Sequence, residues 1–201
     1  MVSERNAENT RHRLLQAAFE EMYLHGYQGL RIDSIIAKTQ LAKGALYHHF
    51  PNKRALAYAI VDELITDIVM SRWARPLESS ADPLTGMQEL LRLYAQQFAD
   101  NEAFQGCPLN NLAQEMAAID EGFQTRLRRV MDVWISAFAE AFSRARLAGQ
   151  LKAEVDPGTT AIYVISTVQG LLCTAKCLQS TADLPRLAEM LCSYIEGLRA
   201  P

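Results

Sequence analysis

The sequence of 201 residues lacks the features that mark several large classes of protein. Its four cysteines form no Cys-x-x-Cys pair, which argues against a zinc site and favours reduced thiols over a disulfide framework. Residues 1–13 are polar and charged, so we expect no secretory leader. The longest apolar run, residues 161–175, is interrupted by polar residues and is shorter than the roughly 18 residues of a spanning helix. The sequence therefore predicts a cytoplasmic protein with no membrane partner.

The sequence also lacks a large net charge: 20 Lys and Arg and 23 Asp and Glu give a net charge of -3. With 49% apolar residues, this balance predicts one large folded domain or two small ones rather than a disordered chain. The charge is unevenly distributed: residues 1–55 carry +3 and the remainder carries -6. All four histidines also lie in the basic part. This asymmetry predicts a basic head that contacts a polyanion and an acidic body that does not.

Alternating strand patterns are almost absent, and helical periodicity occurs along most of the chain. Leu15, Ala18, Phe19 and Met22 share one helical face, and Gly26 follows as a natural end of that helix. Pro76 is expected to stop the fourth helix, and residues 76–83 are expected to form a loop. We predict an all-α fold of about nine helices, over residues 8–25, 33–38, 43–49, 53–75, 84–98, from 108, 123–148, 157–180 and 184–198.

Residues 26–56 contain two short helices joined by a turn, which is the arrangement of a helix-turn-helix. The second helix of such a motif enters the major groove of DNA. Here it begins with Lys43, beside Gly44 and Ala45, whose small size allows the backbone to approach DNA closely. The arrangement is typical of a DNA-binding segment, although any short pair of amphipathic helices shows the same apolar spacing.

Phosphate contacts are expected from the residues that follow. Tyr47 and His48 lie one turn further along the same helix and carry donors suited to phosphate oxygens. Lys53 begins the next helix, where its ammonium and the free N–H groups of the helix start can hold a phosphate.

The run from Lys43 to Lys53, Lys-Gly-Ala-Leu-Tyr-His-His-Phe-Pro-Asn-Lys, resembles the DNA-binding domain of the TetR (tetracycline-repressor, AcrR-like) family of transcriptional regulators. The resemblance covers residues 10–57. It implies a homodimer whose first three helices bind a near-palindromic, double-stranded operator. It also implies a body that binds a small effector and dimerises through the last two helices. We accordingly expect a DNA-binding domain over residues 1–52 and an effector-binding and dimerisation domain over residues 53–201.

Three positions depart from the family pattern. Arg31 stands where the family has a threonine or serine cap, and Ala42 replaces a capping serine at a cost of about 1 kcal/mol. Gln40 replaces a turn glycine, so a left-handed backbone there costs roughly 1 kcal/mol. Arg31 can use its charge to replace one of the phosphate contacts that the absent hydroxyls would make. The predicted DNA-binding residues are Arg31, Lys43, Gly44, Ala45, Tyr47, His48 and Lys53.

The middle helices, residues 84–180, are expected to enclose the effector cavity. Their aromatic side chains are mixed with amides, although each aromatic can equally be an ordinary core residue. No cluster of arginine or lysine demands an anionic ligand, so the expected effector is small and uncharged or lipophilic. The predicted lining is Tyr94, Phe98, Cys107, Asn110, Asn111, Gln114, Trp134, Phe138, Tyr163 and Gln169.

The thiol of Cys107 lies between Gly106 and Pro108, at a predicted helix start where the helix dipole lowers a cysteine pKa. Residues 106–115 resemble the body of an LmrA-like and YxaF-like subgroup, and some TetR-family members sense electrophiles through a cysteine. Two interpretations follow: a reactive sensor thiol, or a small buried residue that caps the helix. Cys173 and Cys177 are expected to be inert packing residues.

Residues 160–178 combine an apolar stripe with a face of small residues, which indicates a helix covered on both sides. A central core helix would show the same pattern. With the family resemblance, we expect a dimer interface formed by residues 157–180 and 184–199 of two subunits. Its predicted contacts are Val164, Val168, Gly170, Leu171, Leu187, Leu191 and Tyr194.

Catalytic patterns are missing from the sequence: it shows no nucleophile–base pair, carboxylate dyad or metal-ligand spacing. We therefore expect no catalytic residue, metal or cofactor, and a helical enzyme or carrier is the less favoured alternative. The sequence predicts a repressor that binds its operator as a homodimer and is released by an effector. An activator with the same helix-turn-helix remains the nearer alternative.

Overall fold

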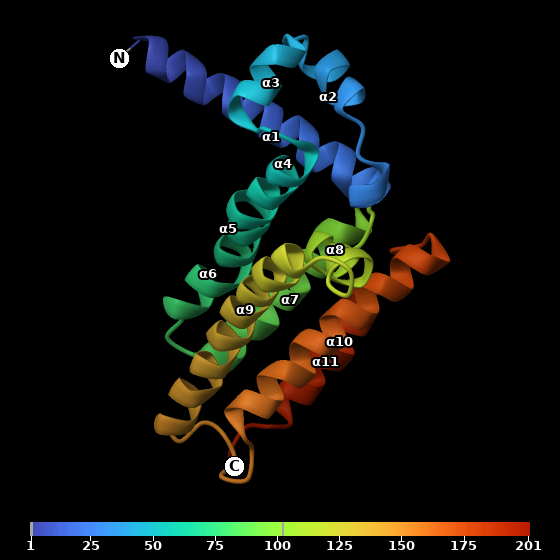
Figure 1. Cartoon of the computed structure of the whole chain (residues 1–201). Coiled ribbons are helices and arrows are strands. Elements are labelled where there is room, and N and C mark those ends of the chain that lie inside the picture. Colours follow the sequence, from blue (N-terminus) through green and yellow to red (C-terminus); the bar gives the residue numbers. More distant parts are fainter. Residues whose placement is uncertain (1, 102) are drawn as a thin grey trace. The chain divides into compact units, whose positions relative to one another are not determined.

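The computed structural model describes residues 2–101 and 103–201, and these residues are mostly helical (Figure 1). Five consecutive segments, α4 to α6 with the π-type segments η1 and η2, follow one another without a break and form one helix over residues 53–78. Counted this way, the described residues contain nine helices, as predicted, and an isolated bridge between Leu151 and Arg199 in place of a sheet. The elements are α1 (Val2–Gly29), α2 (Ile32–Thr39), α3 (Lys43–His49), α4 (Lys53–Ala59), η1 (Ile60–Ile65), α5 (Thr66–Val69), η2 (Met70–Ala74), α6 (Arg75–Glu78), α7 (Pro83–Ala99), α8 (Pro108–Met116), α9 (Glu121–Leu147), α10 (Pro157–Leu178) and α11 (Leu184–Glu196).

Two glycines interrupt or follow helices, and the first of them, Gly26, is where the sequence predicted a helix end. Gly26 has φ 72°, which kinks α1 one turn before its end. Gly149 has φ 71° and lies two residues after Leu147, the last residue of α9. Glycine takes this left-handed conformation without the steric cost that a Cβ adds.

Two aspartate–proline pairs begin helices. Asp156 Oδ1 accepts the N–H of Thr159 at 2.8 Å at the start of α10. Asp82 does the same for α7, accepting the N–H groups of Leu84 at 3.1 Å and Thr85 at 3.2 Å. The predicted loop over residues 76–83 was therefore too long, because Pro83 is already helical.

Pro76 does not stop the long helix, contrary to the prediction, because α6 continues to Glu78. A proline inside an α-helix clashes with the carbonyl four residues earlier and leaves it without a donor. The π-type segment η2 ends at Ala74, two residues before Pro76, and widens the helix there. Pro76 therefore occupies the first turn of a helix that resumes, where a missing N–H is tolerated.

The chain forms two compact units that do not follow chain order. The first unit contains the residues up to Thr66 together with Asn111–Val130, and the second contains Asp67–Asn110 and Met131–Pro201. The core of the first unit includes Leu15, Ile35, Leu46, Leu56 and Phe123, each no more than 1% exposed. The functional boundary at residue 52 stays a prediction.

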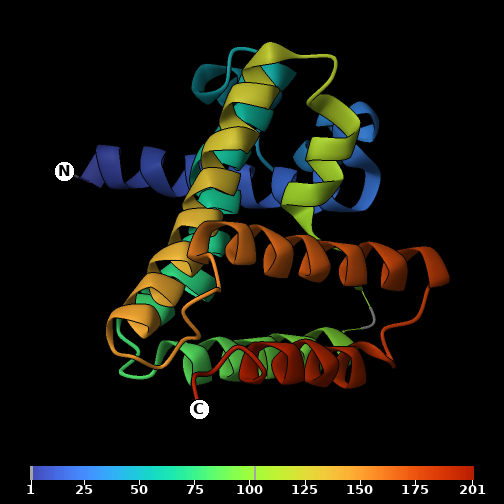
Figure 2. The ribbon, with the colours of Figure 1, turned by 90° about the horizontal axis from the view of Figure 1, so that it is seen from below.

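In the second unit, α11 packs along α7, and Figure 2 shows the two helices side by side. Leu84 and Met87 of α7 and Ile195 of α11 are fully buried. Trp134, Phe138 and Phe142 are the largest buried side chains that α9 adds to the core of this unit.

α10 has the length and composition to cross a membrane, with 22 residues and a third of its most apolar window buried. The expectation that the apolar segment would be too short was therefore wrong, because the helix extends beyond residues 161–175 at both ends. A helix packed in a soluble protein meets the same criteria, so this feature alone places nothing in a membrane.

Candidate DNA-binding surface and ligand cavity

The turn between α2 and α3 has the geometry of a helix-turn-helix without its usual caps. Gln40 has φ 56°, and its N–H donates to Ile36 O at 2.9 Å, so the predicted left-handed position is confirmed. Arg31 and Ala42 precede α2 and α3, and neither side chain makes a capping hydrogen bond. The chain therefore accepts about 1 kcal/mol of backbone strain at Gln40 to close the motif.

α3 is anchored on one face and open on the other. Leu46 is fully buried and Phe50 is 3% exposed, which fixes the orientation of the helix in the first unit. Lys43, Tyr47 and His48 are exposed. A Cβ added to Gly44 would meet nothing within 4 Å, and Ala45 is half-buried behind it. Small residues next to exposed donors make a surface that a DNA backbone can approach closely.

Lys43 is held by an ion pair in the free head. Its ammonium lies 2.9 Å from Asp33 Oδ1 of α2, and both side chains are exposed. This hydrogen bond raises the pKa of Lys43 and lowers the pKa of Asp33. The Lys43 ammonium therefore already has an acidic partner within the head.

Lys53 is the first residue of α4, as predicted. Asn52 caps this helix by accepting the N–H of Ala55 at 2.8 Å. The Lys53 ammonium donates to Gln28 O at 3.0 Å and lies 4.9 Å from the ring centre of Tyr27. The side chain therefore packs on the corner between α1 and α2, a contact that sequence spacing does not reveal.

In the second unit, an aromatic cluster forms around Trp73. Its ring centre lies 5.4 Å from Trp134, 5.0 Å from Tyr94 and 5.7 Å from Phe138. Four of the predicted effector residues, Tyr94, Phe98, Trp134 and Phe138, thus belong to one connected cluster. Sequence reasoning missed Trp73, whose buried place between these rings is set by contacts distant in sequence.

A cavity of about 30 Å³ adjoins this cluster, between η2, α7, α10 and α11. It is lined entirely by apolar and aromatic side chains, which include Tyr94 and Phe98. Such a volume holds about one water-sized group, so a larger ligand requires the lining to move. Its lining is Trp73, Leu91, Tyr94, Ala95, Phe98, Val168, Leu171, Leu172, Leu184, Ala188 and Leu191.

Two polar groups of the second unit, the indole N–H of Trp134 and the guanidinium of Arg72, belong to or contact the aromatic cluster. Trp134 is 2% exposed, and its indole N–H has no acceptor in the structure. A buried donor without an acceptor costs about 1–3 kcal/mol. The Arg72 guanidinium lies 5.4 Å from the ring centre of Tyr94 and 5.5 Å from that of Phe98. Sequence reasoning missed Arg72, because nothing in the local pattern places it on these rings.

Other predicted effector residues lie elsewhere. Tyr163 is 51% exposed and its ring centre lies 4.9 Å from that of Tyr194, so it faces outward from α10. Gln169 donates to the sulfur of Met131 at 3.6 Å. Asn110 belongs to the second unit with the aromatic cluster, whereas Asn111 and Gln114 belong to the first.

Cys107 precedes α8, as predicted, but its acidity changes in the opposite direction. Burial raises the pKa of the thiol, and this effect outweighs the lowering by the backbone N–H groups of Asn110 and Leu109 and by the charge of Arg72. The prediction of a lowered pKa was therefore wrong, because desolvation of the thiolate exceeds the helix-end stabilisation. The structure favours the interpretation of a small residue that caps α8.

Alkylation of Cys107 by iodoacetamide should reflect this raised pKa. We expect its rate to keep rising with pH beyond about 8.5, the ordinary cysteine pKa, because only the thiolate reacts. Mass spectrometry of the Cys107 peptide at several pH values measures this rate, and the urea-unfolded chain serves as the control. A rate that levels off below pH 7 would restore the sensor interpretation.

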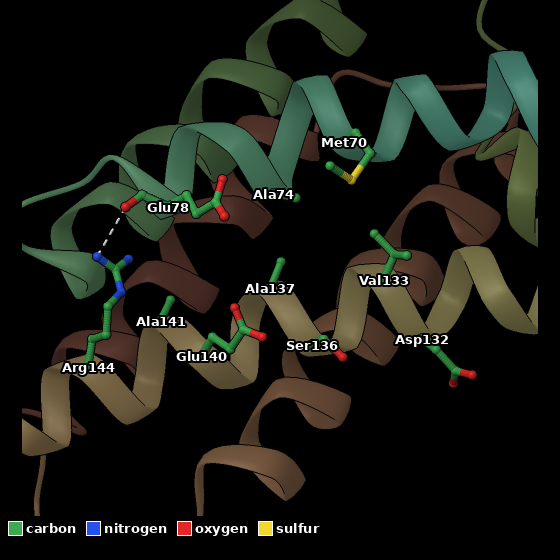
Figure 3. Close-up of a pocket in the computed structure, with 10 residues that line it drawn as sticks. All are labelled: Met70, Ala74, Glu78, Asp132, Val133, Ser136, Ala137, Glu140, Ala141 and Arg144. Carbon is green, nitrogen blue, oxygen red and sulfur yellow. Dashed lines mark hydrogen bonds between the residues drawn. The ribbon is translucent and has the colours of Figure 1, made fainter.

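A separate groove of about 360 Å³ lies between the long helix of residues 53–78 and α9, in the second unit (Figure 3). Its floor contains small residues such as Ala74 and Ala137, and three acids lie along it. Arg144 closes one end by donating to the carbonyls of Leu77, Glu78 and Ser80, at 3.3 Å and 3.1 Å for the last two. None of the predicted effector residues lines this groove.

Exposure divides the predicted interface residues into two groups. Val164, Val168 and Leu191 are 0%, 7% and 5% exposed within a single chain, so they belong to the core of that chain, and a subunit contact by them stays a prediction. Val164 and Val168 lie on the buried face of α10, and Leu191 lies on the buried face of α11. Because α10 is apolar around most of its circumference, periodicity could not tell which of its faces is buried. Gly170 and Tyr194 are exposed, whereas Leu171 and Leu187 are half-buried.

A three-helix head with a helix-turn-helix, followed by a helical body with an aromatic cluster, defines a DNA-binding regulator of transcription. Comparison with known proteins gives the same class. Residues 14–60 match the family "Bacterial regulatory proteins, tetR family", and residues 83–197 match "Transcriptional regulator LmrA/YxaF-like, C-terminal domain". The chain belongs to the TetR family of transcriptional regulators, which are not enzymes.

Individual relatives support this assignment. The regulator LmrA of Bacillus subtilis is 31% identical over 66% of this chain and 70% of its own length. YxaF of the same organism is 32% identical over 65% of this chain and 69% of its own length. A TetR regulator from Chloroflexus aurantiacus is 28% identical, with a TM-score of 0.84 over 97% of this chain and 98% of that one.

Proposed function

We propose that this regulator is a cytoplasmic repressor that binds a near-palindromic operator as a homodimer and releases it when a small effector binds. The observation that carries the proposal is the pairing of an exposed α3 with an aromatic cluster that contains an unsatisfied buried donor. The first feature supplies a surface for the major groove, and the second supplies a place for a ligand.

The proposed dimer interface is the exposed apolar face of α10 and α11. Ile162 and Tyr163 of α10 are each 51% exposed, and Met190 and Tyr194 of α11 are 65% and 39% exposed. Gly170 opens the same exposed side of α10 to a close approach, because a Cβ there would meet nothing within 4 Å. Apolar surface of this extent on adjacent helices supports contact with a second subunit related by two-fold symmetry.

The proposed effector is small, uncharged or lipophilic, and carries one hydrogen-bond acceptor. Tyr94, Phe98 and Phe138 supply apolar contact, and the indole N–H of Trp134 supplies the donor that the acceptor satisfies. The remaining proposed contacts in this unit, Cys107 and Asn110, supply a small and a polar group. Effector binding favours a conformation with weaker operator affinity, and linkage requires DNA to weaken effector binding equally.

A mobility-shift titration on the DNA that flanks the protein's own gene tests this proposal. We expect a specific complex that candidate aromatic ligands dissociate, and we expect the variant Trp134→Phe to require more ligand for the same effect. Transcription from this DNA should fall when the protein is added alone. A rise in transcription would contradict the repressor role, and a ligand response equal in Trp134→Phe would contradict the role of the indole N–H.

The variant Lys53→Met is expected to weaken binding equally for all DNA sequences. It keeps most of the apolar stem that packs against Tyr27 but removes the ammonium, and with it the proposed interaction with a phosphate. The slope of log affinity against log salt concentration should fall by about one for each phosphate that is no longer neutralised. The control Lys53→Arg keeps the charge and should keep the slope. An unchanged slope in Lys53→Met would show that Lys53 neutralises no phosphate.

A further inference from the structure

The corner between α1 and α2 is held by a carboxylate from a distant part of the sequence. Gly26 interrupts α1 with φ 72°, and the next two backbone N–H groups point to Glu115 of α8. Tyr27 N–H donates to Glu115 Oε2 at 2.9 Å, and Gln28 N–H donates to Glu115 Oε1 at 2.8 Å. Each oxygen of the carboxylate thus has its own backbone partner, 88 and 87 residues away in the chain.

The carboxylate fits closely against the kink. A Cβ built on Gly26 would lie 2.7 Å from Glu115 Oε2, so glycine at this position leaves the room that the carboxylate occupies. The next residue of α8 is Met116, and its sulfur accepts a hydrogen bond from the side-chain amide Nε2 of Gln28 at 3.7 Å. Two consecutive residues of α8 therefore contact the corner from which α2 begins.

Other contacts on the corner are aromatic or come from the head itself. The Tyr27 ring packs on Phe123 with centres 4.9 Å apart, and Lys53 donates to Gln28 O on the other side. These groups leave the N–H groups of Tyr27 and Gln28 to Glu115. Hydrogen bonds from backbone N–H groups to a carboxylate are about twice as strong as those between neutral groups.

We propose that Glu115 is a positioning residue for DNA binding. Its carboxylate fixes the corner from which α2 and α3 project, and so raises the fraction of molecules in which α3 is placed to enter the major groove. Apparent affinity falls in proportion to this competent fraction. The role requires the DNA-binding surface alone, and neither an effector nor repression.

The sign of the effect separates this role from a general effect of charge. An acid in a DNA-binding unit repels phosphate, so its removal through charge alone strengthens binding. Loss of a positioning carboxylate weakens binding, because the two N–H groups lose their acceptors and the corner becomes mobile. The two explanations therefore predict opposite changes for one substitution.

The experiment compares full-length Glu115→Ala, Glu115→Gln and Glu121→Ala with the parent protein on the same operator fragment. Glu121 is an exposed acid of the same unit, and its replacement removes the same charge. We expect Glu115→Ala to bind about tenfold more weakly, the loss of one or two such hydrogen bonds, with an unchanged salt slope. Glu115→Gln keeps one acceptor oxygen, so its DNA affinity should lie between those of Glu115→Ala and the parent protein. Glu121→Ala should bind DNA as tightly as the parent protein or more tightly.

Amide hydrogen exchange gives a second readout in the free protein. The amides of Tyr27 and Gln28 should exchange faster in Glu115→Ala, and should keep their protection in Glu121→Ala. Unchanged or tighter DNA binding by Glu115→Ala, or unchanged protection of both amides, would overturn the proposal. If Glu115→Ala does not fold, Glu115→Gln, which has the same size, carries both tests. If the parent protein binds no DNA, the proposed function fails, and hydrogen exchange alone decides whether Glu115 holds the corner.

Discussion

Replacing Gly170 with arginine is expected to leave a folded monomer that no longer binds a complete operator. Gly170 is exposed on α10, and a Cβ there meets nothing within 4 Å, so a single chain accommodates the new side chain. In the proposed dimer, this position lies against the partner. An arginine there buries a charge without a partner in each subunit, at about 3–5 kcal/mol for each. Sedimentation velocity should show one mass of 22.5 kDa instead of twice that value.

The control for this variant is Gln124→Arg, which adds the same side chain to an exposed position of α9. We expect Gln124→Arg to remain dimeric with an unchanged melting temperature. If Gly170→Arg also remains dimeric, the exposed face of α10 is not the subunit interface. The operator complex should weaken by a factor of more than about one hundred in Gly170→Arg, since single heads lose the second half-site.

Replacing Lys43 with alanine should have the second largest effect, because two copies of α3 contact one operator in the proposed dimer. A contact to a base edge supplies about 1–3 kcal/mol of discrimination, and breaking the Lys43–Asp33 pair offsets part of it. We therefore expect operator affinity to fall about tenfold for each head and about one hundredfold for the dimer. The variant should also discriminate less among bases. Fluorescence anisotropy with the operator and with single-base variants of it measures both quantities.

Lys38→Ala is the matched control for Lys43. Lys38 also lies in the head and forms an ion pair with Glu20, but it belongs to α2. Its loss should weaken binding slightly and to the same degree for every DNA sequence. If Lys43→Ala weakens the operator and unrelated DNA by one common factor, then Lys43 contacts phosphate and reads no base.

Local signals predicted the ends of most helices. The pair Asp156-Pro157 and the residues Gly26 and Gly149 determine helix ends through their own backbone and side-chain chemistry. For this reason the nine helices and the helix-turn-helix could be predicted from the sequence. Pro76 is the exception, because the π-type segment before it removes the conflict that usually ends a helix.

Features that depend on contacts distant in sequence could not be predicted. The Cys107 thiol has a raised pKa because neighbours bury it, and the local Gly-Cys-Pro pattern indicates only the helix end. Val164 and Tyr163 are adjacent on an apolar helix, yet one faces the core and the other faces outward. Glu115 reaches Tyr27 across 88 residues, which no local pattern records. Burial and pairing of this kind emerge only when the helices pack.

Operator binding by a dimer is tested by a DNase footprint with a stoichiometric titration on the DNA that flanks the protein's own gene. We predict a protected, near-palindromic site that binds two chains, with half-sites one helical turn or somewhat more apart and an affinity that falls as salt increases. We also predict that the Lys43→Ala variant loses this footprint at concentrations where the parent protein is saturated. Equal protection of all DNA sequences from DNase, or a specific site that is saturated by one chain, would contradict binding of an operator by a dimer.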